Sequence, residues 1–132
     1  MMKRVTDIKQ ALINTPEAPN DLMVKADNLW NTLKDISLKF NRESNFPSTE
    51  ENPPSPVTFN ERLGVLSYTH YRSSSNITQN ERNAYKVLMD KFPPVLEQLK
   101  SLYNYDLKTL EDDMEKYGAP WTPGRIPTLN VE

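Results

Sequence analysis

Leucines and aromatic residues recur at intervals of three and four positions along most of this chain. That spacing places them on one face of an α-helix, whereas a half-buried strand would alternate with a period of two. The clearest run consists of Leu22, Ala26, Leu29, Leu33, Ile36 and Phe40. The sequence therefore predicts an all-α protein built from amphipathic helices.

Four helical stretches are expected, at about residues 3–14, 21–41, 58–72 and 78–117. The third and fourth each open on a capping box, in which Thr58 pairs with Glu61 and Thr78 with Glu81. A four-helix up-and-down bundle buries four apolar faces most simply, and 132 residues suffice for one core. We therefore expect residues 1–132 to form a single helical domain.

The fourth stretch is long and contains Pro93 and Pro94. Each proline costs roughly 3 kcal/mol in an unadapted helix, so a kink or short break is expected near Lys91. The expected apolar face keeps its phase across the prolines, which favours a kink. It consists of Ala84, Leu88, Phe92, Leu96, Leu99, Tyr103, Leu107, Leu110, Met114 and Tyr117.

Two segments are expected to lie outside helices. Residues 42–57 contain four prolines and no glycine, which predicts an extended connection that either crosses the surface or contacts a partner. Gly118 is expected to close the last helix in a left-handed conformation, and the prolines that follow prevent the helix from resuming. Residues 118–132 are therefore predicted to form an extended C-terminal tail.

The composition excludes several kinds of partner and site. Lysine and arginine number 16 against 18 acidic residues, which leaves no excess of positive charge for nucleic acid. The absence of cysteine removes disulfides and thiolate metal sites and leaves the compartment undetermined. No stretch has the apolar length of a signal peptide or a membrane span. Met1 and Met2 open either a complete gene product or an excised fragment.

Candidate catalytic residues are few. His70 is the only histidine and lacks companion ligands, so we expect a hydrogen-bonded residue at a helix end. The last helix carries an acidic cluster that we expect to be a solvated face: Asp106, Glu111, Asp112, Asp113 and Glu115. No phosphate-binding loop, nucleophile elbow or zinc-protease motif is present, so no catalytic residue, metal or cofactor is predicted. The six tyrosines are expected to be partly buried, with a stacking surface as the alternative.

The tail contains the most distinctive motif in the chain. Residues 117–127 read Tyr-Gly-Ala-Pro-Trp-Thr-Pro-Gly-Arg-Ile-Pro, in which prolines and glycines fix the backbone around one tryptophan and one arginine. The motif resembles the closing Gly-Ala-Pro-Trp-Thr-Pro-Gly-Arg segment of large bacterial sortilin-like β-propeller proteins, often labelled BNR-repeat glycosyl hydrolases. Residues 92–99 and the passage up to Arg62 look like the same helical region, so the similarity extends loosely over almost the whole chain.

The resemblance implies a C-terminal helical module that follows a β-propeller, cut out or separately encoded. Its partner would be the propeller domain of the parent protein or a neighbouring subunit, and the parent proteins look exported. The propeller's Ser-x-Asp-x-Gly-x-Thr-Trp repeats do not occur here, so no hydrolase activity carries over. The expected contact residues are Trp121 and Arg125, flanked by Pro120 and Pro123, because tryptophan and arginine dominate interface energetics. Alternatively, Trp121 folds back over the open end of its own bundle.

The function expected from these patterns is that of a non-catalytic accessory or interaction domain. One alternative is a fragment of a carbohydrate-acting hydrolase, which follows only from the label of the resembling family. The other is a helical protein that forms a homodimer through apolar surface left uncovered.

Overall fold

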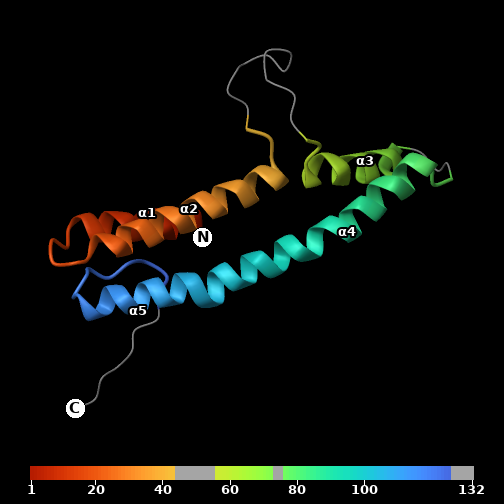
Figure 1. Ribbon diagram of the computed structural model, residues 1–132. Helices are drawn as coiled ribbons and strands as arrows, with labels where there is room; N and C mark the ends of the chain where they lie inside the picture. Colours follow the sequence, from red (N-terminus) through yellow and green to blue (C-terminus); the bar gives the residue numbers. More distant parts are fainter. Residues whose placement is uncertain (44–55, 73–75, 126–132) are drawn as a thin grey trace. The chain divides into compact units, whose positions relative to one another are not determined.

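The computed structural model describes residues 1–43, 56–72 and 76–125, and no strand occurs among them (Figure 1). The predicted all-α fold with four helical stretches is confirmed. The first three stretches are α1 (Met2–Ile13), α2 (Asn20–Phe40) and α3 (Phe59–Arg72). The fourth consists of α4 (Gln79–Ser101), the π-helical segment η2 (Leu102–Leu107) and α5 (Lys108–Lys116). Most of the connection 42–57 and the tail beyond residue 125 lie outside the described residues.

The chain separates into two compact units. The terminal unit comprises Met1–Lys34 and Leu99–Glu132, and the central unit comprises Asp35–Gln98. Two segments from opposite ends of the chain thus share one unit. The expectation that residues 1–132 form a single domain stays a prediction.

The terminal unit is a bundle of α1, the first part of α2, η2 and α5 (Figure 1). The spacing of Val5, Ile8 and Leu12 predicts an apolar face on the first helix, and this face and the one that begins at Leu22 are both buried. Figure 1 shows α1 and the start of α2 side by side, and Lys9 Nζ of α1 lies 2.6 Å from the carboxylate of Asp27 in α2. Its core is made of Val5, Ile8, Leu12, Leu22, Ala26, Leu29, Leu33, Leu102, Leu107, Leu110 and Met114.

The central unit is organised around three phenylalanine rings. Phe40, Phe59 and Phe92 come from α2, α3 and α4, and their centroids lie 5.2 to 6.1 Å apart in edge-to-face geometry. This geometry directs the positive edge of one ring toward the negative face of another. The helical spacing of Phe59, Leu63, Leu66 and His70 predicts an apolar face for α3. This face is only partly confirmed, because Phe59 is buried whereas Leu63 is exposed.

Both predicted capping boxes are present. The amide of Thr58 donates to Glu61 at 2.8 Å, and the amide of Glu61 donates to the hydroxyl of Thr58 at 3.2 Å. Thr78 and Glu81 repeat this pattern at the start of α4. The hydrogen bond from the Thr58 amide lowers the pKa of Glu61, aided by the charge of Arg42, so this carboxylate remains ionised at mildly acidic pH.

The apolar face of the fourth stretch differs from the expected one. Leu96, Tyr103 and Tyr117 are exposed, whereas Val95 and Leu102 are buried instead. The buried residues of α4 keep a regular helical spacing through Leu102, and the next buried residue, Leu107, follows five positions later across η2. A π-helix inserts an extra residue in one turn, so it rotates the following residues relative to the preceding ones. The 3.6-residue period used for the prediction has no such step.

The prolines of α4 do not interrupt the helix. Pro93 and Pro94 lie inside Gln79–Ser101, so the short break expected near Lys91 does not occur. The kink stays a prediction.

The end of α5 is a Schellman motif, as the position of Gly118 predicts. The amide of Ala119 donates to the carbonyl of Met114 at 3.1 Å, and the amide of Gly118 donates to that of Glu115 at 3.0 Å. Gly118 has a φ of 64°, in the left-handed region that favours glycine.

Substitution of two glycines by alanine should have opposite effects. Gly118→Ala should lower the free energy of unfolding by about 1 kcal/mol, because alanine is strained at positive φ. Gly64→Ala should raise it by about 0.5–1 kcal/mol, because Gly64 lies inside α3 and a methyl group there meets no atom within 4 Å. Urea denaturation followed by circular dichroism measures both. A stabilising Gly118→Ala would contradict the Schellman end of α5.

Candidate functional site

The C-terminal segment after α5 belongs to the terminal unit and carries all four expected contact residues. Trp121, Pro120 and Pro123 are exposed, and the indole residue keeps 53% of its surface accessible. Arg125 has a buried side chain, which forms an ion pair with Glu115 of α5 and lies 5.6 Å from the centre of the Trp121 ring. The structure therefore brings Trp121 and Arg125 together, with the arginine as the anchored partner.

The segment lies against an ion pair that the sequence patterns did not predict. Arg4 of α1 donates two hydrogen bonds to Glu111 of α5, each 2.7 Å long, in the forked geometry of a guanidinium on a carboxylate. Burial opposes the charge of Arg4, but the hydrogen bonds and charge of Glu111, with a contribution from Tyr103, outweigh it. The pKa of Arg4 is therefore raised.

The tail crosses the Arg4 side chain at Gly124. This glycine has a φ of 91°, and a Cβ placed on it would lie 3.6 Å from three atoms of Arg4. The adjacent Thr122 is buried, and its hydroxyl has no hydrogen-bond partner in residues 1–43, 56–72 and 76–125. Packing of Thr122 and Arg125 fixes the segment while the neighbouring Trp121 ring stays accessible.

The six tyrosines correct the expectation of partial burial. They are all exposed, with accessible fractions between 42% and 88%. The members are Tyr68, Tyr71, Tyr85, Tyr103, Tyr105 and Tyr117. Helical spacing predicted burial, but these positions fall beside the buried faces rather than on them.

Two carboxylates of the acidic cluster in the last helix form ion pairs within the terminal unit, whereas a solvated face was expected. Glu111 is buried against Arg4, which corrects the expectation of a solvated residue there. Asp113 lies 2.8 Å from Lys116 and 3.6 Å from Lys25, and the hydrogen bond from Lys116 lowers its pKa. The carboxylates thus join elements of the terminal unit.

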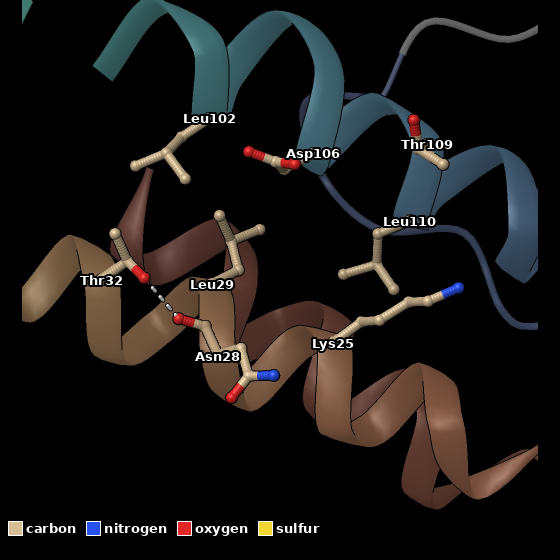
Figure 2. Close-up of a pocket in the computed structure, with 8 residues that line it drawn as sticks. All are labelled: Lys25, Asn28, Leu29, Thr32, Leu102, Asp106, Thr109 and Leu110. Carbon is tan, nitrogen blue, oxygen red and sulfur yellow. Dashed lines mark hydrogen bonds between the residues drawn. The ribbon is translucent and has the colours of Figure 1, made fainter. Parts of the chain in front are cut away.

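A pocket of about 400 Å³ lies between α2 and the η2–α5 segment, within the terminal unit (Figure 2). Figure 2 shows side chains of α2 facing those of η2 and α5 across it. Apolar groups come from Leu29, Leu102 and Leu110, and polar groups from Lys25, Asn28, Thr32, Asp106 and Thr109. The Lys25 ammonium contacts Asp21 at 3.1 Å, which raises its pKa and keeps it protonated, so it is a poor nucleophile at neutral pH.

Other site types find no support in the described part of the chain. Residues 1–43, 56–72 and 76–125 hold no group of three or more histidine, cysteine or acidic side chains arranged for a metal ion. None of the helices in these ranges has the length and hydropathy needed to cross a membrane. The side chain of His70 lies outside the described parts, so the expectation for it stays a prediction.

Comparisons of the chain with protein-family models, with curated proteins and with solved structures find no match. The resemblance of the tail to sortilin-like propeller proteins therefore has no independent support.

The Arg4–Glu111 pair should dominate the stability of the terminal unit. Glu111→Leu should lower the free energy of unfolding by about 3 kcal/mol, because it leaves the guanidinium largely buried without its carboxylate. The double variant Arg4→Met/Glu111→Leu should recover most of this loss, since no charge is then left unpaired. Chemical denaturation measures both variants.

A matched control comes from the more exposed pair of Lys9 and Asp27. Lys9→Met should cost less than about 1 kcal/mol, as is usual for pairs in contact with water. A Glu111→Leu effect no larger than that of Lys9→Met would contradict the importance of the buried fork.

Proposed function

We propose that this chain is a non-catalytic interaction domain that binds a protein partner through the Trp121 surface, defined as Pro120, Trp121 and Pro123. The observation that supports it most is the combination of a half-exposed indole with neighbours that are fixed. Thr122 is buried, Arg125 is ion-paired to Glu115, and Gly124 packs on Arg4. A large aromatic group is thus held in one orientation before any partner arrives.

Such preorganisation favours binding. Each flexible side chain that becomes ordered on association costs about 0.5–1.5 kcal/mol of conformational free energy. A tryptophan already held by Arg125 loses little freedom on binding and can bury a large apolar area. Tryptophan and arginine are also the residues most enriched among those that carry interface energy.

The partner that we propose is a β-propeller of the sortilin-like class. This choice rests on the Gly-Ala-Pro-Trp-Thr-Pro-Gly-Arg motif in residues 118–125. In this proposal the chain is the helical module that follows the propeller, and the Trp121 surface contacts the propeller or a neighbouring subunit. A native reading frame that encodes the propeller's Ser-x-Asp-x-Gly-x-Thr-Trp repeats upstream of Met1 would support it.

Trp121→Ala should weaken binding to a recombinant sortilin-like propeller domain by at least about tenfold, equivalent to about 1.4 kcal/mol. The helical circular dichroism should barely change, because more than half of the residue is already in contact with water. Isothermal titration calorimetry measures the affinity. Tyr105→Ala removes another exposed aromatic residue of the terminal unit and serves as the control, with no expected loss.

Three results would contradict the proposal. The first is a wild-type chain that does not bind the propeller, and the second is an unchanged affinity for Trp121→Ala. The third is a parallel loss of binding and helix content, which would assign Trp121 to the core.

A further inference from the structure

Helix α4 carries a second apolar face, and the other helices of the central unit leave much of it exposed. Tyr85, Met89, Phe92 and Leu96 are spaced by four, three and four residues, and each is exposed. We call these four residues the α4 stripe. Phe92 also forms edge-to-face contacts with Phe40 and Phe59, so the stripe borders the core of the central unit.

Apart from Phe92, the α4 stripe is distinct from the face that packs inside the central unit. The buried residues are Ala84, Leu88 and Val95. At about 100° per residue, the centres of the two faces lie roughly 90° apart around the helix. This is the arrangement of a helix in a four-helix bundle, which contacts two neighbours about a quarter turn apart. Within the central unit, the buried residues of α4 lie in one of these two directions, whereas in the other Phe92 packs on Phe40 and Phe59 and stays partly exposed.

The spacing of the stripe indicates what covers it. Intervals of four and three average 3.5 residues, the period that keeps two helices in contact along a shared seam. A second copy of the same helix has the same period, and a pair of helical hairpins related by a two-fold axis closes a four-helix bundle.

The flanking charges select an antiparallel pair. Lys86 follows Tyr85 at one end of the stripe and Glu97 follows Leu96 at the other, so both lie on the same side of it. In an antiparallel pair these sides meet, which brings Lys86 of each copy toward Glu97 of the other. In a parallel pair this side would face the one that carries Leu88 and Val95, which are already buried.

We infer that the α4 stripe binds a second copy of this chain, with the two α4 helices antiparallel. Tyr85 then lies level with Leu96 of the second copy, and Met89 with its Phe92. The inference is independent of the proposed function, because it concerns the central unit and a different partner. Stable interfaces bury about 800 Å² per partner, and this stripe is smaller, so a reversible dimer is expected.

Leu96→Glu tests the surface. It should weaken dimerisation by at least about tenfold, because it places a charge in the seam. Leu38→Glu is the matched control, since Leu38 is exposed to 39% and Leu96 to 37%, and both lie on helices of the central unit. Sedimentation equilibrium over a range of concentrations gives the dissociation constants, and helical circular dichroism verifies that both variants fold.

Disulfide cross-linking tests the orientation, because the chain has no cysteine of its own. A mixture of the Tyr85→Cys and Leu96→Cys chains should cross-link to each other in the antiparallel pair. Tyr85→Cys alone should not, because its two copies would lie roughly 16 Å apart along the helix axes, beyond the reach of a disulfide.

Four outcomes would overturn the inference. These are a wild-type chain that is monomeric at every concentration, equal effects of Leu96→Glu and Leu38→Glu, cross-linking of Tyr85→Cys to itself, and no cross-link in the mixture. If the Leu96→Glu variant no longer dimerises but still binds the propeller, the α4 stripe and the Trp121 surface are separate binding surfaces.

Discussion

The forked ion pair between Arg4 and Glu111 is the interaction on which the terminal unit depends. It joins two helices whose paired residues are 107 positions apart in the sequence, and it does so with two hydrogen bonds of 2.7 Å. The two paired side chains themselves have little access to water, so an unpaired charge there would be costly. The same arginine also lies under Gly124, which links the closure of the bundle to the course of the tail. The position of the Trp121 surface follows from that link.

Local signals in the sequence predicted much of the fold. The apolar stepping from Val5 to Leu12 and from Leu22 to Ile36 marks the faces that are buried. The Thr-to-Glu boxes mark the starts of α3 and α4, and Gly118 marks the end of α5. Each of these signals acts within a few residues along the chain, so spacing and residue type are enough to recognise it.

The features that the sequence did not predict are contacts between distant residues or departures from regular α-helical geometry. The step of five residues from Leu102 to Leu107 in the π-helix cannot be seen in a 3.6-residue period, and the expected face included Leu96 and Tyr103, which are exposed. Glu111 looked like one carboxylate among several, because its partner lies at the other end of the chain. Trp121 and Arg125 were predicted as contact residues from their chemistry, which stays a prediction, and the burial of Thr122 between them had no local signal.

The two proposed binding surfaces differ in character. The Trp121 surface is a single large ring fixed by packing on the terminal unit, whereas the α4 stripe is a periodic face on the central unit. The first suits a partner with a pocket for one aromatic group, and the second suits another helix of the same period.

Native-state hydrogen exchange tests most directly whether α1 and α5 form one cooperative core. We expect the amides of Val5 and Ile8 in α1 and of Leu110 and Met114 in α5 to share one opening free energy, equal to that of unfolding of the terminal unit. Exchange of the α1 amides at the rate of an isolated helix, while those of α5 stay protected, would contradict it.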